Sequence, residues 1–114
     1  IKGFFDCSAH GGGICQALKE KGKAGEVKVV SLALPSMSAT YLKDGSMSHG
    51  MAWRPADAGY ATCYAAYLLA SNQGVSNATD LKATGYENIV LEGNIAYGNA
   101  PLEFTAENID DYNF

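Results

Sequence analysis

Strand-like and helix-like segments alternate along this chain, and the alternation restricts its possible folds more than any single residue does. Apolar runs at 1–6, 27–34 and 48–53 are expected to be strands. Segments at 12–21, 35–42 and 55–71 place apolar residues at helical spacing and are expected to be helices. Repeated strand–helix–strand units favour a mostly parallel sheet with right-handed crossovers, so the sequence predicts the α/β class.

The second expected strand, Val27 to Leu34, is nearly continuous in apolar character. Val29, Val30 and Leu32 leave little polar alternation along it. Such a run is typical of a strand that is buried on both faces of a parallel sheet.

The last part of the chain has a different character. A polar link is expected at 72–84, and short strands are expected at 88–91, 94–97 and 102–104. Gly93, Gly98 and Pro101 separate these strands. Thr105 is expected to be the N-cap of a final helical turn, with Glu107 in its first turn.

Charge and cysteine usage exclude several function classes. The 114 residues include 8 Lys and Arg and 12 Asp and Glu, giving a net charge of -4. A surface of this kind lacks the positive charge that nucleic acids or anionic membranes require. No run approaches the ~20 apolar residues of a membrane-spanning helix. The three cysteines match neither a zinc spacing nor a CxxC pair, so neither a metal nor another cofactor is expected.

The junction between the third expected strand and the helix at 55–71 has the strongest ligand-binding character. Trp53, Arg54 and Asp57 offer an apolar ring, a guanidinium and a carboxylate within five residues. This combination suits a small polyhydroxylated molecule at the carboxyl end of a strand. Ordinary helix-start chemistry is an equally open explanation, because Pro55 and Asp57 are typical first-turn residues.

A second polar segment, residues 6–13, joins the first expected strand to its helix. Asp6 and Ser8 are suited to contact a polar ligand there. The glycines Gly11 to Gly13 match neither the Walker pattern nor G-x-G-x-x-G. Cys7 and His10 leave a different class open, that of a small autonomous α/β enzyme with an activated thiolate.

Histidine and tyrosine elsewhere favour structural roles. His49 has no second ligand at metal spacing. Tyr60, Tyr64 and Tyr67 fall at helical spacing and favour packing over a stacking platform.

Four segments in order resemble the C-terminal part of type 1 periplasmic sugar-binding proteins. They are Val29–Ser36, Tyr41–Gly45, Ala52–Tyr60 and Leu102–Phe114, and the last is similar to the terminus of the autoinducer-2-binding and rhamnose-binding branch. The resemblance implies a three-layer Rossmann-like sheet, incomplete in this chain, followed by a short β-rich segment. It assigns residues 1–71 to the α/β core of a lobe and residues 72–114 to a linker and a terminal crossing segment.

The same resemblance implies a two-lobed extracytoplasmic protein that binds a solute and delivers it to an ABC importer. Family contact positions fall on Asp6, Cys7 and Ser8, on Ala33, and on Trp53 and Arg54, with Asp57 nearby. Many sugar-binding relatives carry Asp where Ala33 stands, which weakens a pyranose or furanose assignment.

The sequence therefore predicts a non-catalytic fragment of a solute-binding protein for a sugar or autoinducer-2-like ligand. A small enzyme using the Cys7 or Gly11–Gly13 loop, and a flavodoxin-shaped interaction domain, are the alternatives. A fragment would expose sheet edge and apolar lobe surface, so a dimer or strand exchange is expected.

Overall fold

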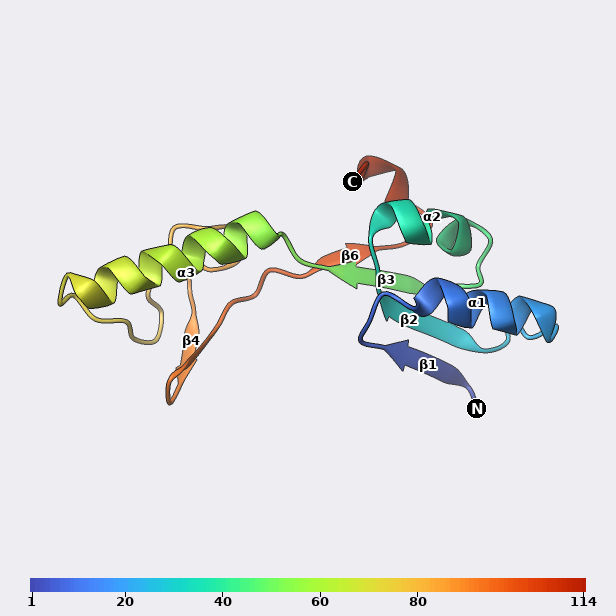
Figure 1. Ribbon diagram of the computed structural model, residues 1–114, viewed down its shortest axis with the longest axis horizontal. Coiled ribbons are helices and arrows are strands. Elements are labelled where there is room, and N and C mark those ends of the chain that lie inside the picture. Colours follow the sequence, from blue (N-terminus) through green and yellow to red (C-terminus); the bar gives the residue numbers. More distant parts are fainter. The chain divides into compact units, whose positions relative to one another are not determined.

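The computed structural model describes all residues, 1–114, as two compact units. Unit 1 consists of Ile1–Ala52 and Leu102–Phe114, and unit 2 consists of Trp53–Pro101. The chain therefore leaves unit 1 after Ala52 and returns to it at Leu102 (Figure 1).

Unit 1 is built on a four-stranded sheet in the order β1-β2-β3-β6. β1 (Gly3–Asp6), β2 (Lys28–Leu32) and β3 (His49–Ala52) are parallel, and β6 (Leu102–Phe104) pairs antiparallel with β3. The predicted mixed α/β class with a mostly parallel sheet is confirmed.

Two helices and a final turn accompany this sheet. α1 (Gly11–Glu20) follows β1, α2 (Pro35–Lys43) follows β2, and the 3-10 helix η1 (Ile109–Asp111) follows β6. Pro35 takes the first helical turn of α2, where its missing N–H costs no hydrogen bond. The buried core of unit 1 takes residues from α1, β2, α2, β6, η1 and the turn before β3, namely Cys15, Val29, Leu42, Phe104, Ile109 and Met47.

The two faces of this sheet are not equally covered. Val29 and Ser31 of β2 are fully buried, whereas Val30 and Leu32, which alternate with them along the strand, are half-buried. Phe5, the partner of Val30 in β1, is 67% exposed. The expectation that β2 is buried on both faces is wrong for this chain, because α1 and α2 pack on the Val29 side alone.

The last turn also differs from its prediction. η1 begins at Ile109 rather than directly after Thr105. Asn108 Oδ1 accepts the backbone N–H of Thr105 at 2.7 Å, and Thr105 O accepts that of Ile109 at 3.1 Å. These bonds form a turn at 105–109, so Thr105 does not cap a helix with its side chain.

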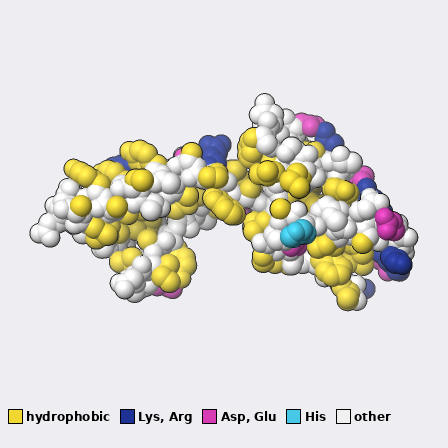
Figure 2. Space-filling model, viewed as in Figure 1, with side chains coloured by type: hydrophobic (Ala, Val, Ile, Leu, Met, Phe, Trp, Pro, Cys, Tyr) yellow, Lys and Arg dark blue, Asp and Glu magenta, His cyan; other side chains and the backbone are white.

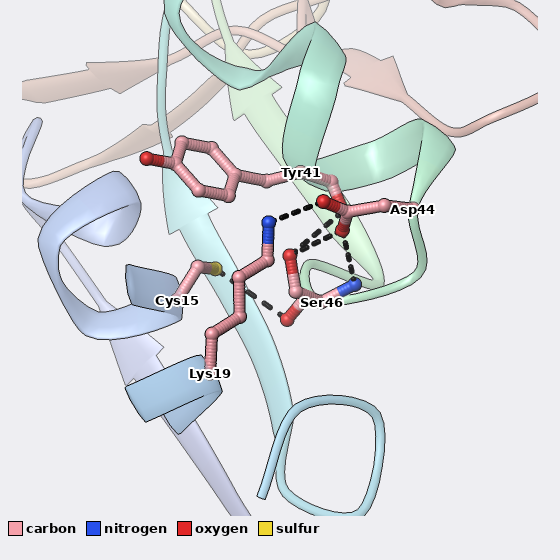
Figure 3. A network of polar contacts seen from close by, with 5 residues as sticks. All are labelled: Cys15, Lys19, Tyr41, Asp44 and Ser46. Carbon is pink, nitrogen blue, oxygen red and sulfur yellow. Dashed lines mark hydrogen bonds and ion pairs between the residues drawn. The ribbon is translucent and has the colours of Figure 1, made fainter. Parts of the chain in front are cut away.

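A polar network ties α1 to the turn between α2 and β3 (Figure 3). Asp44 Oδ1 accepts the Ser46 N–H at 3.0 Å and the Ser46 hydroxyl at 2.5 Å, and Asp44 Oδ2 forms an ion pair with Lys19. The Lys19 ammonium also lies 4.8 Å from the centre of the Tyr41 ring. Buried Cys15 donates to Ser46 O at 3.4 Å, and burial raises the pKa of its thiol.

Unit 2 is organised around α3 (Pro55–Ala70), whose only charged residue is Asp57. Ala61 and Leu68 of α3 are buried against residues of the segment that follows, namely Leu81, Ala83 and Ile89. Three of the five buried residues of this small core thus follow α3, and two of them, Leu81 and Ala83, lie in the stretch 72–84 that was expected to be a polar link. β4 (Val90–Glu92) and β5 (Ile95–Tyr97) form a separate antiparallel hairpin.

The outer side of α3 remains rich in hydrophobic side chains (Figure 2). Tyr64 is half-buried against the unit 2 core, and Tyr60 and Tyr67 flank it with ring centres 6.3 and 5.9 Å away. The tyrosines therefore pack against one another and in part against the core. No helix of the chain combines the length and the apolar character that crossing a bilayer requires.

Candidate functional site

The carboxyl end of β1 carries the best-organised polar group of unit 1. Asp6 is the last residue of β1, and its Oδ1 accepts the Ser8 N–H at 3.1 Å and the Ser8 hydroxyl at 2.7 Å. This is a side-chain turn of the kind that Asp favours where a strand leaves a sheet. Two of the three predicted contact residues here, Asp6 and Ser8, are thus hydrogen-bonded to each other.

Ser31 holds the other carboxylate oxygen of Asp6. The parallel pairing of β1 with β2 sets Asp6 opposite Ser31, and the Ser31 hydroxyl lies 2.9 Å from Asp6 Oδ2. Ser31 is fully buried, although it stands in an otherwise apolar strand. The sequence analysis did not identify Ser31 as a site residue. The signal that could have found it is a single serine between Val30 and Leu32 in an apolar strand.

A glycine lets α1 approach Ser31 closely. A Cβ built on Gly11 would lie 2.3 Å from the Ser31 hydroxyl oxygen, far inside van der Waals contact. Gly11 therefore serves close packing of helix on strand rather than binding of a phosphate.

Hydrogen bonding lowers the pKa of the Asp6 carboxyl. The Ser8 hydroxyl contributes most to lowering the pKa of the Asp6 carboxyl, and the Ser31 hydroxyl and the backbone N–H groups of Ser8 and His10 add to it, against a smaller opposing effect of burial. The group is an ionised hydrogen-bond acceptor at neutral pH, and Oδ2, whose side-chain donor is Ser31 alone, is the oxygen suited to the hydroxyl of a solute.

Cys7 and His10 do not form the pair that an activated thiolate requires. Cys7 is an exposed free thiol, and His10 Nδ1 lies 2.7 Å from Ser8 Oγ instead. Asp6 also contacts Ser8 rather than the imidazole. In a Ser-His-Asp triad the acid orients the histidine and the histidine takes the serine proton, so this arrangement has the wrong order.

Ala33 lies just beyond the carboxyl end of β2. Its backbone N–H donates to Met51 O at 3.0 Å, and its side chain is half-buried. Ala33 thus shares the carboxyl edge of the sheet with Asp6, two positions after Ser31. Its methyl group offers a solute no hydrogen bond.

Trp53, Arg54 and Asp57 belong to unit 2, at the start of α3. Arg54 is the extended N-cap residue, Pro55 follows it in the first turn, and Asp57 is the acidic residue of that turn. Trp53 is 53% exposed, and Arg54 takes part in none of the four ion pairs of the chain. The role of these three residues in one site with Asp6 and Ser8 stays a prediction.

No group of three or more His, Cys, Asp or Glu side chains is placed to hold a metal ion. All three cysteines are free, so Cys7 and Cys15 are not bridged.

Comparison with known proteins agrees with this architecture. Residues 1–74 match the model of a family described as periplasmic binding protein domain. A sugar ABC transporter structure from Actinomyces odontolyticus is similar over 100% of this chain and 38% of that one, at 25% identity and a TM-score of 0.74. No curated protein matches the sequence significantly.

Two further solved structures share the fold at lower identity. LsrB from Clostridium saccharobutylicum in complex with AI-2 is 21% identical over 100% of this chain and 40% of that chain, with a TM-score of 0.65. A solute-binding protein from Agrobacterium vitis bound with α-D-tagatopyranose is 21% identical over 97% of this chain and 32% of that chain, also with a TM-score of 0.65. The chain thus spans about two fifths or less of the length of these structures.

Proposed function

Because the chain belongs to the periplasmic binding protein domain family, we propose that it forms part of a protein that binds a small polyhydroxylated solute. The solute is a sugar or an autoinducer-2-like molecule, and the protein passes it unchanged to an ABC importer. On this proposal the protein works outside the cytoplasm.

The observation that carries this proposal is the ionised Asp6 carboxylate at the carboxyl end of β1. Ser8 and Ser31 fix both of its oxygens, and the carboxyl edge of a parallel sheet is where α/β proteins place their ligand groups. A fixed carboxylate can accept hydrogen bonds from the hydroxyls of a sugar without first reorganising, which lowers the free-energy cost of binding.

The remaining contacts are proposed from the family resemblance. Cys7 and Ser8 follow Asp6 in the same loop, and Ala33 shares the sheet edge with them. Trp53 would supply an apolar face for the C–H bonds of a sugar, and Arg54 and Asp57 would meet its hydroxyls.

The proposed domain assignment follows the same reasoning. Residues 1–71 would be the α/β core of a lobe, and residues 72–114 a linker and terminal crossing segment of a larger protein. The similar structures are each more than twice as long as the chain, which supports its being part of a larger protein.

Calorimetry on the intact protein with D-tagatose, D-ribose and AI-2 tests the proposal. Asp6→Asn should weaken binding about ten- to a hundredfold, because it removes a charge-assisted acceptor. Asp111→Asn is the matched control, since it removes an exposed carboxylate from the final turn. If the Asp6 variant binds like wild type, the site is assigned to the wrong residue.

Unit 2 is tested separately. Arg54→Ala should weaken the same binding about ten- to a hundredfold while leaving the free energy of unfolding nearly unchanged, because the side chain is exposed. Asp57→Asn separates the two explanations of the junction. A binding role predicts weaker affinity, whereas a helix-start role predicts intact binding and a stability loss of about 0.3–1 kcal/mol.

A further inference from the structure

The loop after β1 contains a hydrogen-bonded series whose direction follows from counting protons. Ser8 Oγ lies 2.7 Å from Asp6 Oδ1 on one side and 2.7 Å from His10 Nδ1 on the other. A serine hydroxyl carries one proton, so it can donate in only one of these two contacts.

The carboxylate decides which contact receives that proton. An ionised carboxylate has no proton to give, so the short contact between Ser8 Oγ and Asp6 Oδ1 requires the Ser8 proton. In the opposite arrangement two oxygens, one of them charged, would lie 2.7 Å apart with only lone pairs between them. The proton in the second contact must therefore come from His10.

We propose that His10 is a positioning residue whose Nδ1–H donates to Ser8 Oγ and thereby directs the Ser8 hydroxyl onto the Asp6 carboxylate. His10 Nε2 is then unprotonated in the neutral ring.

The backbone around His10 supports this role. His10 O accepts the N–H groups of Gly13 at 2.9 Å and of Ile14 at 3.2 Å, which anchors His10 to the first turn of α1. Ser31 holds the far oxygen of Asp6 from β2. The carboxylate is thus held from both sides, by Ser8 in the loop and by Ser31 in β2.

Nitrogen NMR of the imidazole rings tests the direction without any solute. Long-range proton–nitrogen spectra of the intact protein should show a protonated Nδ1 and an unprotonated Nε2 for neutral His10, with the signals assigned by their loss in His10→Asn. His49, which makes no side-chain hydrogen bond, is the internal reference and should favour the Nε2–H form of free histidine. A neutral His10 protonated at Nε2 would overturn the proposal.

Rescue by a conservative variant tests the positioning role, which rests on the proposed function. His10→Ala should weaken binding of whichever of D-tagatose, D-ribose or AI-2 the wild type takes by about three- to tenfold. His10→Asn keeps an N–H donor near the position of Nδ1 and should retain most of the affinity. Equal affinity in His10→Ala would contradict the positioning role. Failure of the wild type to bind any of the three solutes would count against the proposed function. The NMR spectra would still decide whether His10 donates to Ser8.

Discussion

Asp6 owes its lowered pKa to hydrogen bonds that exist only in the folded chain, so its effect on stability depends on pH. The folded-state pKa lies below the ordinary unfolded value of about 3.9, so the stabilisation is present above that value. It is lost as the pH falls through the folded-state pKa.

Urea unfolding of wild type and Asp6→Asn between pH 7 and pH 2 measures this dependence. The variants should differ in free energy of unfolding at neutral pH, and the difference should shrink below about pH 4. Asp44, Asp80 and Glu107 also have lowered pKa values, but they are common to both proteins and cancel in the difference. If the difference in free energy of unfolding between the two proteins does not change with pH, the hydrogen bonds to Asp6 do not lower its pKa.

Gly11 gives a second prediction for a single residue. Gly11→Ala should destabilise unit 1 by about 1–3 kcal/mol, because its methyl group would overlap Ser31 and approach Met47. Gly13→Ala is the matched control in the same helix, since nothing lies within 4 Å of the added carbon. It should be neutral or stabilise by up to about 1 kcal/mol, as helix propensity favours Ala. Denaturation curves that show equal effects would mean that α1 can move away from β2.

Sequence reasoning could find Asp6 and Ser8 but not Ser31. The first two stand in a polar loop after an apolar strand, where ligand groups are expected. Ser31 lies within a strand, and only the pairing of β1 with β2 brings it to Asp6. The sequence pairs His10 with Cys7 as a possible base for a thiolate. A separation of three residues does not show which side chain the imidazole contacts, and in the structure that side chain is Ser8.

At the scale of elements, Asp44 links α1, the end of α2 and the turn that precedes β3. Asp44→Ala should cost about 1–2 kcal/mol, because the buried Ser46 hydroxyl would keep only a 3.3 Å contact with Tyr41 O and Lys19 would lose its partner. Asp110→Ala removes only the exposed ion pair with Lys43 and should change stability by less than about 0.5 kcal/mol. Chemical denaturation of both variants measures the two costs, and equal costs would show that the network adds nothing beyond a surface ion pair.

The positions of the elements were largely predictable, whereas their exposure was not. Pro35 and Pro55 mark the starts of α2 and α3, and the apolar runs mark β1, β2 and β3. Whether Val30 is covered depends on what packs on its side of the sheet, and the chain places no helix there. Local pattern predicts a strand but not the layers on either side of it.

At the scale of the whole molecule, the division into two units was not predictable from local pattern. Leu81 and Ala83 lie in a polar segment that has no regular periodicity, and Ile89 lies in the short strand expected after it. They become a core only when that segment folds back onto Ala61 and Leu68 of α3.

The uncovered sheet face predicts self-association of the 114-residue chain. β1 is an edge strand, and Phe5 on it is 67% exposed beside half-buried Val30. An unpaired edge next to apolar surface tends to find a partner, so we expect a dimer or strand exchange. Sedimentation velocity should show a species larger than the monomer at high concentration, and Phe5→Glu should shift it toward the monomer. A wild type that stays monomeric would contradict the prediction.

The points at which the chain leaves and re-enters unit 1 are direct neighbours, since Ala52 of β3 pairs with Leu102 of β6. Unit 2 is thus an insertion at the tip of a hairpin, and each unit keeps a hydrophobic core of its own. Replacing residues 53–101 with the hairpin turn Asn-Gly should leave a protein that retains the β3–β6 pairing and unfolds cooperatively. Amide exchange that shows no protection of Gly50 and Phe104 in that excised protein would mean that unit 1 depends on the insertion. Cooperative unfolding would mean that the core of unit 1 forms without the insertion of residues 53–101.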